Sequence, residues 1–251
     1  MKIVAITQAR CGSTRLPNKV LKTVKGETLL AIHLNRILKS KKIDQLVVAT
    51  TTEPADDAIE EVAKSMGLPY YRGSVSNVLD RYYQAAKSHH PDWVVRLTSD
   101  CPLIDAGLID KIIDKAIELD VDYCSNTLNP TYPDGMDAEV FKYSALERAW
   151  HEAQLNSEKE HVTPYIHKNS SFHHKNLFTS YNYANDVNYE RVRLTVDEQA
   201  DFEVISHLIN NLGLDKNWKI YADYYLEDKT INELNGNITR NEGYAASLKK
   251  D

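Results

Sequence analysis

A short segment near the N-terminus, residues 9–19, combines side chains that could bind phosphate. It joins three cations to a glycine and two hydroxyls: Arg10, Gly12, Ser13, Thr14, Arg15 and Lys19. A glycine lets backbone N–H groups turn toward one point, and the hydroxyls and cations add further donors, so the segment predicts a polyphosphate-binding loop. It has neither the GK[ST] of a P-loop nor the GxGxxG of dinucleotide-binding folds. A solvated basic loop is the alternative interpretation.

Two aspartates each follow an apolar run typical of a strand. Asp100 comes after residues 93–98, and Asp197 comes after residues 191–196. Two carboxylates at strand ends could share one Mg²⁺ that also binds phosphate. The alternatives are a turn for Asp100 and a helix N-cap for Asp197. Cys101 is expected to pack as a small side chain, since no histidine partner or metal-ligand spacing accompanies it.

These residues need elements that position them, and the first half of the chain alternates strand-like and helix-like patterns. The expected strands are residues 2–7, 46–50, 70–72, 93–98 and 122–125. The expected helices are residues 27–40, 55–66, 77–88 and 108–119. This alternation predicts an α/β fold, with a mixed, mostly parallel sheet and helices on both faces. Ligands in such folds bind beyond the carboxyl ends of the strands.

The pattern changes after about residue 126. A Pro/Gly/Asp loop at 129–137, a helix at 144–154 and a histidine-containing stretch at 160–168 precede a strand at 191–196 and a helix at 201–212. We interpret residues 1–251 as a single domain that carries an insertion at about 127–190. The tail from about residue 235 is polar and expected to be loosely held.

Composition narrows the class of protein. The chain has 251 residues, and Lys+Arg 30 against Asp+Glu 36 gives a net charge of −6, which disfavours binding to nucleic acid or an anionic membrane. No apolar run approaches the ~18–20 residues of a membrane span, and the N-terminal apolar run is too short for a secretory signal. The three cysteines lack CxxC spacing, so a cytoplasmic protein without disulfides or zinc is expected.

Residues 9–19 closely resemble the nucleotide loop of the CMP-sugar synthetases, especially the STRLP-x-K form of the CMP-Kdo synthetases. The chain as a whole resembles the branch of that cytidylyltransferase superfamily named after spore coat polysaccharide biosynthesis protein F, also related to acylneuraminate cytidylyltransferases. The resemblance rests on further motifs that follow in matching order: RGSVSNVLDRYY (72–83), RLTSDCPLID (96–105), YPDGMDAEVF (132–141), EHVTPY (160–165) and RLTVDEQADFEVI (193–205). It covers residues 1 to about 212.

The resemblance implies a GT-A-like, Rossmann-like nucleotidyltransferase fold and transfer of CMP from CTP to a sugar acid, with release of pyrophosphate. The residues matching the nucleotide site are Ala9, Arg10, Gly12, Ser13, Arg15, Lys19, Arg72, Ser74, Asn77, Asp80 and Thr98. Those matching the catalytic and Mg²⁺-binding positions are Arg15, Lys19, Asp100 and Asp197. Those matching the acceptor side are Asp134, Glu139, His161 and Arg193. Asn18 departs from the family, in which glycine is common at this position.

Other functions remain open. A GT-A glycosyltransferase shares the fold but usually has a D-x-D motif, whereas residues 98–102 contain one aspartate. A nucleotidyltransferase that uses a sugar phosphate or another nucleotide is a second alternative, and a non-catalytic nucleotide-binding protein is a third. The 15 tyrosines could form a homodimer surface or pack within one subunit.

Overall fold

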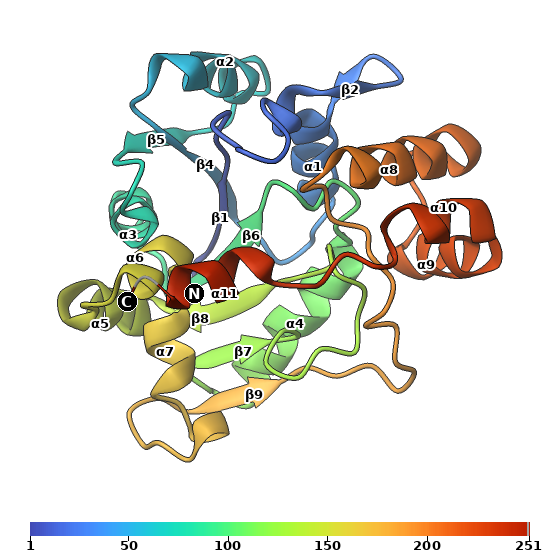
Figure 1. The fold of residues 1–251 in the computed structure, drawn as a ribbon. Helices are drawn as coiled ribbons and strands as arrows, with labels where there is room; N and C mark the ends of the chain where they lie inside the picture. The colour runs from blue at the N-terminus through green and yellow to red at the C-terminus, as the bar shows by residue number, and fades with distance from the viewer. Residues whose placement is uncertain (250) are drawn as a thin grey trace.

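A seven-stranded sheet in the order β5-β4-β1-β6-β8-β7-β9 forms the centre of the molecule (Figure 1). The computed structural model describes residues 1–249 and 251. The strands are β1 (Ile3–Gln8), β4 (Gln45–Thr51), β5 (Tyr70–Gly73), β6 (Trp93–Thr98), β7 (Tyr123–Ser125), β8 (Glu139–Lys142) and β9 (Ser180–Asn182). β1 pairs in parallel with β4 and β6, whereas β8 is antiparallel to β6 and β7. The predicted mixed, mostly parallel sheet is confirmed.

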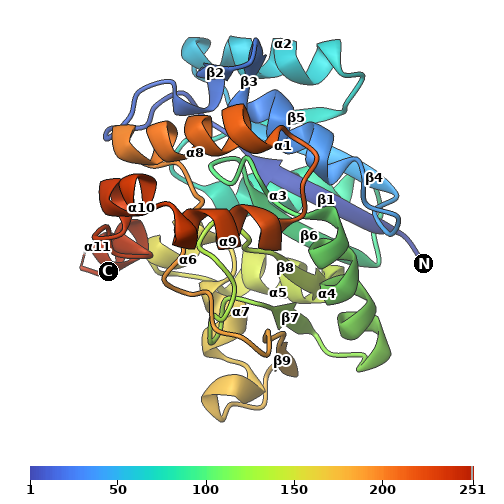
Figure 2. The ribbon, with the colours of Figure 1, turned by 90° about the vertical axis from the view of Figure 1, so that its right-hand side faces the viewer.

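Helices cover both faces of the sheet because its central strands are apolar on both sides. Ile3 and Ala5 of β1 face one apolar cluster, and Val4 and Ile6 face the other. The first cluster is completed by α1 (Leu29–Ile37), α2 (Asp57–Ser65), α4 (Ala106–Glu118), α8 (Gln199–Leu212), α9 (Trp218–Glu227) and α10 (Lys229–Asn235). The second is completed by α3 (Val78–Lys87), α5 (Tyr143–Glu152) and α7 (Pro164–Lys168). Figure 2 shows α1, α8 and α9 along the face of the first cluster.

Residues 127–190 are built into the main sheet. β8 lies between β6 and β7, and β9 extends the sheet beyond β7. The sequence analysis did not predict β8, because a run of four residues between a turn and a helix carries too little periodicity. A short hairpin, β2 (Thr23–Val24) with β3 (Glu27–Thr28), was missed for the same reason. Because β3 occupies residues 27–28, α1 begins two residues later than expected.

The predicted strand at residues 191–196 is wrong. This segment joins no strand of the sheet and forms one isolated bridge, between Asp134 and Arg193. Its backbone instead bonds to two loops, because Leu194 N–H donates to the Asp134 carbonyl at 2.7 Å and Val196 N–H donates to the Asp100 carbonyl at 2.7 Å. The segment therefore ties the loop after β6 to the loop before β8.

Gly135 makes that crossing possible. Its φ is +105°, and a Cβ added there would lie 2.5 Å from the Leu194 carbonyl carbon. Gly135→Ala is expected to lower the free energy of unfolding by about 2–4 kcal/mol, since backbone strain adds to overpacking. Denaturant unfolding measures it, with Gly12→Ala as control because no atom lies within 4 Å of a Cβ there. Equal stabilities of the two variants would contradict the argument.

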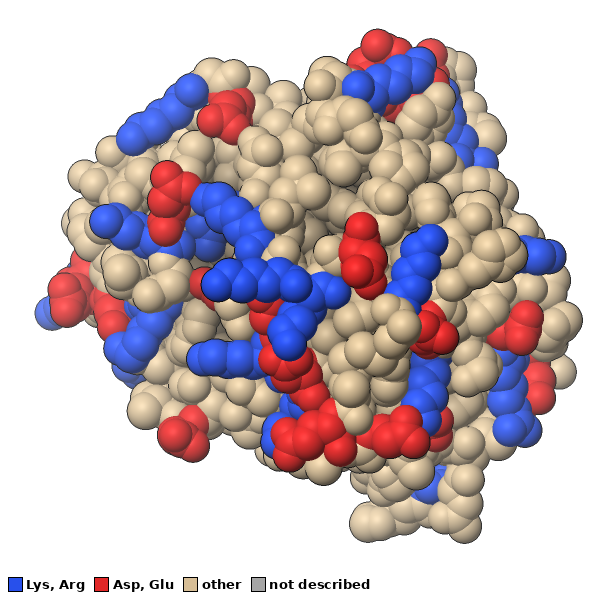
Figure 3. Space-filling model, turned by 180° about the vertical axis from the view of Figure 1, so that it is seen from behind, with Lys and Arg blue, Asp and Glu red and all other residues tan. Residues whose placement is uncertain are grey.

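The C-terminal tail, which was expected to be loosely held, begins with a buried residue. Asn235 is 1% exposed, and its side chain donates to Asp201 at 2.9 Å. Beyond it, α11 (Glu242–Leu248) lies in front of the sheet in Figure 1. On the opposite face, Lys and Arg lie interspersed with Asp and Glu (Figure 3). Within the described residues, no helix has the length and apolar character needed to cross a membrane.

Candidate active site

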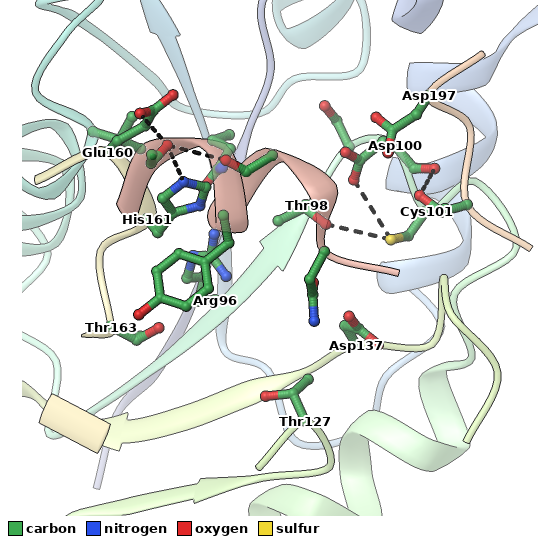
Figure 4. A pocket seen from close by; sticks show the side chains of 18 of the residues that line it. Arg96, Thr98, Asp100, Cys101, Thr127, Asp137, Glu160, His161, Thr163 and Asp197 are labelled. Atoms are coloured by element: carbon green, nitrogen blue, oxygen red, sulfur yellow. Dashed lines mark hydrogen bonds between the residues drawn. The ribbon is translucent and has the colours of Figure 1, made fainter. Parts of the chain in front are cut away.

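A cleft of about 860 Å³ lies beyond the carboxyl ends of β1 and β6. The chain goes from β1 to β4 on one side and returns to β6 on the other, so the cleft is at the topological switch point of the sheet. Residues from segments 8–20 and 75–81 line one part of it, here called the β1 half. Residues 127–139 and 160–173 line the other part, here called the β8 half (Figure 4).

Lys19 joins the two predicted aspartates at the centre of the cleft. Its Nζ lies 2.8 Å from Asp197 Oδ1 and 3.2 Å from Asp100 Oδ2. Arg15 adds a second cation, with Nη2 3.0 Å from Asp197 Oδ2. Burial alone would raise the pKa of Asp100, but Lys19 outweighs it and the pKa is lowered to about 2. The same carboxylates raise the pKa of Lys19 against its own burial, so Lys19 and Asp100 are both charged at neutral pH.

The strand-end loops that carry these groups are fixed by buried bonds. The Asp100 carbonyl accepts from the hydroxyl of Thr195 at 3.1 Å, which holds the segment before Asp197 beside it. His33 is fully buried and lies 2.8 Å from both the Thr7 hydroxyl and the Cys101 carbonyl. Burial lowers the pKa of His33 to about 4, so a neutral imidazole links the ends of β1 and β6.

The loop of residues 9–19 turns through a left-handed backbone at Asn18. Its φ is 55°, and asparagine tolerates the left-handed region better than most residues. Cys11 N–H donates to Asp56 Oδ1 at 2.6 Å and fixes the loop to the start of α2. Burial, reinforced by Asp56, raises the pKa of the Cys11 thiol to about 11.

The structure brings most of the predicted site residues to this one cleft. Those that line it are Ala9, Arg10, Ser13, Arg15, Lys19, Thr98, Asp100, Asp134, Glu139, His161 and Asp197. Arg193 lies directly behind the wall, where its guanidinium is 2.8 Å from both Asp134 and Asp201. Gly12 belongs to the loop but is not among the lining residues.

The polar side chains of residues 72–80 were expected at the nucleotide site, but they make structural contacts instead. Arg72 is 2.7 Å from both Asp57 and Glu60 and ties β5 to α2. Asn77 caps α3 by accepting from Asp80 N–H at 3.0 Å. Asp80 accepts from the indole of Trp150 at 2.9 Å. Ser74 is exposed and bonds within its own turn.

Arg81 follows this motif and lines the cleft, and the sequence analysis did not identify it as a site residue. Its side chain is 2% exposed, and neither Nε nor Nη1 has a hydrogen-bond partner among the described residues. Burial and the nearby Arg10 lower the pKa of its guanidinium. Gly73 leaves room for it, since a Cβ there would lie 2.7 Å from Arg81 Cγ. The arginine in LDRYY was visible in the sequence, but nothing local distinguished it from a surface cation of α3.

The β8 half is built around buried ion pairs. Glu139 of β8 pairs with Arg96 of β6 and accepts a hydrogen bond from the hydroxyl of Tyr123 on β7. Burial raises the pKa of Glu139, but Arg96 and two hydrogen bonds outweigh it and the pKa is lowered. Burial and the neighbouring Asp137 raise the pKa of Asp134 to about 7, because Arg240 and Arg193 offset them only in part.

The C-terminal segment also reaches the cleft, which the sequence analysis did not predict. Arg240 donates to the Tyr132 carbonyl at 3.2 Å and pairs with Asp137. Asn241, Glu242, Gly243, Tyr244, Ala246 and Ser247 line the cleft beyond it. No motif pointed to these residues, because their place depends on the fold of the chain as a whole.

The donor set at the centre of the cleft suits a hard divalent cation. Asp100 and Asp197 offer carboxylate oxygens around one point, which Lys19 occupies in this structure. Among the described residues no group of three or more His, Cys, Asp or Glu could hold a metal ion by itself. Two carboxylates therefore fit Mg²⁺ when phosphate oxygens complete its coordination, as Mg²⁺ prefers.

The model of the cytidylyltransferase family matches residues 4–231, and the chain belongs to this family. The uncharacterized protein MJ1063 of Methanocaldococcus jannaschii is 40% identical over 242 residues, which cover 95% of this chain and 96% of that protein. The spore coat polysaccharide biosynthesis protein SpsF of Bacillus subtilis is 33% identical over a match that covers 84% of this chain and 88% of that protein. A solved cytidylyltransferase from Leptospira borgpetersenii is 34% identical, with a TM-score of 0.86 over 92% of this chain and 96% of that one. The expected fold and the CTP-dependent nucleotidyltransferase class are thus confirmed.

Proposed function

We propose that this cytidylyltransferase transfers CMP from CTP to a 2-keto sugar acid of the nonulosonic or Kdo-like class, for synthesis of a surface polysaccharide or glycan. The observation that carries the proposal is the Lys19 cluster, in which Arg15 and Lys19 meet Asp100 and Asp197 at the switch point of the sheet. The similarity to SpsF supports the polysaccharide role. The STRLP-x-K loop, which resembles that of the CMP-Kdo synthetases, supports the acceptor class.

The acceptor hydroxyl attacks the α-phosphorus in line, so the chain mainly positions reactants and offsets negative charge. Arg15 and Lys19 bind the β- and γ-phosphates and stabilise the pyrophosphate as it leaves. Lys19 exchanges its carboxylate partners for phosphate oxygens when CTP binds. Mg²⁺ held by Asp100 and Asp197 would neutralise phosphate charge and polarise the reacting phosphorus.

The β8 half supports an anionic, hydroxyl-rich acceptor. Arg96 lines the cleft and keeps a buried Nε without a hydrogen-bond partner among the described residues, and such a donor suits a carboxylate. Burial lowers the pKa of His161 and of His167 to about 4 each, so both imidazoles are neutral hydrogen-bonding groups. The carboxylates of this half offer acceptors for sugar hydroxyls.

Arg81 is proposed to bind the nucleotide, since a buried guanidinium with free donors lacks only an acceptor. Arg81→Met is expected to weaken CTP binding about 10- to 100-fold, the value of a hydrogen bond to a charged group. The free energy of unfolding should not fall, because the substitution removes a buried charge without a partner. Calorimetry with CTP and denaturant unfolding measure the two effects. Unchanged CTP affinity would contradict this role.

We also propose that the enzyme acts in the cytoplasm as a homodimer. Segment 172–187 supports the dimer, since Phe172, Tyr181 and Val187 are 40%, 40% and 58% exposed. Apolar side chains gathered on one exposed segment suit a protein interface.

A pyrophosphate-release screen of CTP, UTP, GTP and ATP against sugar acids and sugar phosphates tests the proposed function. Release with CTP and a sugar acid is expected. Release only with a sugar phosphate or another nucleotide would replace the proposed substrates. Consumption of a nucleotide sugar without pyrophosphate would favour a glycosyltransferase instead.

A further inference from the structure

Residues 241–248, here called the C-terminal cap, lie over the cleft although they follow the part of the chain that matches the family model. That match ends at residue 231. The cap consists of Asn241 and α11, and Figure 4 shows its helix beside the labelled side chains of His161 and Thr98. The cap therefore covers the substrate site with residues that the family match does not include.

The cap contacts Arg15, Glu160 and His161, which all line the cleft. Glu242 Oε2 lies 3.5 Å from Arg15 Nη1. The Ser247 hydroxyl donates to Glu160 at 2.7 Å and lies 3.0 Å from His161 Nε2. In this cluster the carboxylate accepts from the serine rather than from the imidazole, so it lacks the geometry of a hydrolase triad. The cluster fastens the cap to the β8 half.

The cap has little apolar anchorage. Ser247 is the buried residue of α11, and the described residues of the two apolar clusters end at Ile231. Leu248 is 43% exposed. The ion pair between Arg15 and Glu242 joins side chains that are 37% and 47% exposed, and such pairs stabilise weakly. The Tyr244 ring adds an edge-to-face contact with His161, at 5.0 Å between ring centroids. A segment held by a few contacts of these kinds opens at low cost in free energy.

The guanidinium of Arg15 is expected to bind a triphosphate more strongly than it binds Glu242. Phosphate oxygens form stronger charge-assisted and bidentate bonds with a guanidinium than one distant carboxylate oxygen does. Because CTP gains this interaction only when Glu242 gives up Arg15, CTP binding favours the state in which the cap is released.

We propose that the C-terminal cap is a nucleotide-released lid over the acceptor side of the cleft. While the cleft is empty, Glu242 holds the cap to Arg15 and the cap covers the surface near His161. The triphosphate of CTP binds Arg15 in place of Glu242. The cap is then released, and the surface near His161 becomes accessible to the acceptor. The inference rests on the proposed function, because it takes Arg15 as a ligand of the triphosphate. With such a lid, the acceptor binds after the nucleotide.

Hydrogen exchange of the full chain, measured on peptides covering residues 241–248, tests the lid. Exchange is expected to rise when CTP with Mg²⁺, or inorganic tripolyphosphate, is added without an acceptor. Glu242→Gln should raise exchange without ligand and tighten CTP binding about two- to fivefold, the range of one exposed ion pair. Glu233→Gln, an exposed residue of α10, is the matched control and should change neither quantity.

The outcomes separate the lid from the proposed function. CTP binding with unchanged or lowered exchange of the cap overturns the lid and leaves the proposed function standing. A rise with tripolyphosphate but no binding of CTP supports the lid and overturns the assignment of CTP. Absence of binding by both ligands overturns both proposals. Equal CTP affinity of the Glu242→Gln and Glu233→Gln variants also overturns the lid.

Discussion

Lys19→Ala and Asp100→Asn are each expected to lower kcat about 10²–10³-fold at saturating CTP and Mg²⁺, the usual cost of losing a preorganised charge. Lys19 is the cation that both carboxylates share, and it is 12% exposed on its side chain. Without it, Arg15 is the remaining cation of the cluster that can stabilise the leaving pyrophosphate. Asp100→Asn keeps the shape of the side chain but removes the ionised oxygen that faces Lys19. Pyrophosphate release at several Mg²⁺ concentrations measures both effects.

Lys22→Ala is the control for these two variants. Lys22 lies in the same part of the chain, but its Nζ stands 4.9 Å from the centroid of the Phe202 ring and does not line the cleft. It should retain activity close to that of the unmodified protein. Circular dichroism of all variants shows whether the fold is kept. Near-normal activity of Lys19→Ala or Asp100→Asn would contradict the site assignment.

The second large effect is expected on stability, at the buried pair of Glu139 and Arg96. Their side chains are 8% and 13% exposed, and the pair joins β8 to β6 at the centre of the sheet. Glu139→Ala leaves the guanidinium buried without its counter-charge, so the free energy of unfolding should fall by about 3–5 kcal/mol. Denaturant unfolding measures it. Glu152→Ala is the matched control, because it removes the exposed pair with Arg148 on α5 and should cost less than about 1 kcal/mol.

The pH dependence of the two proteins adds a check on the same pair. The pKa of Glu139 is lowered in the folded protein, from an ordinary value of 4.5. Its ionised form therefore stabilises the fold above that ordinary pKa, and this contribution is lost as the pH falls through the lowered pKa. The stability difference between the protein and Glu139→Ala should shrink in acid. A difference that is constant with pH, or no larger than that of Glu152→Ala, would contradict a structural role for the pair.

Local patterns were sufficient for the parts of the fold with long, regular elements. The central strands β1, β4 and β6 are apolar on both faces, and α1 to α4 carry the apolar spacing of helices. β8 has four residues, and its partners lie far away in sequence. Residues 191–196 have strand-like composition but bond to loops, because Gly135 lets the two backbones approach each other closely. Pairing of this kind is decided by tertiary structure.

Some residues of the candidate site could likewise be predicted from local patterns, and others could not. Lys19 and Asp100 could be predicted, because β1 and β6 are parallel neighbours whose ends meet at one edge of the sheet, and these residue types suit phosphate and Mg²⁺. Asp197 was predicted at the same place, although the strand expected before it does not form. Arg81 could not, because its significance lies in being buried without a partner. The C-terminal cap could not either, since it reaches the cleft only through contacts with residues more than 80 positions away, such as Glu160 and Arg15.

The fate of the α-phosphorus of CTP tests the central claim most directly. The protein is incubated with CTP labelled at that phosphorus, Mg²⁺ and a panel of 2-keto sugar acids, and the labelled products are separated. The account predicts that the label moves into a CMP-sugar while one pyrophosphate is released for each CTP consumed. Label that stays in CTP with each sugar acid, while the protein consumes a ready-made CMP-sugar, would contradict it.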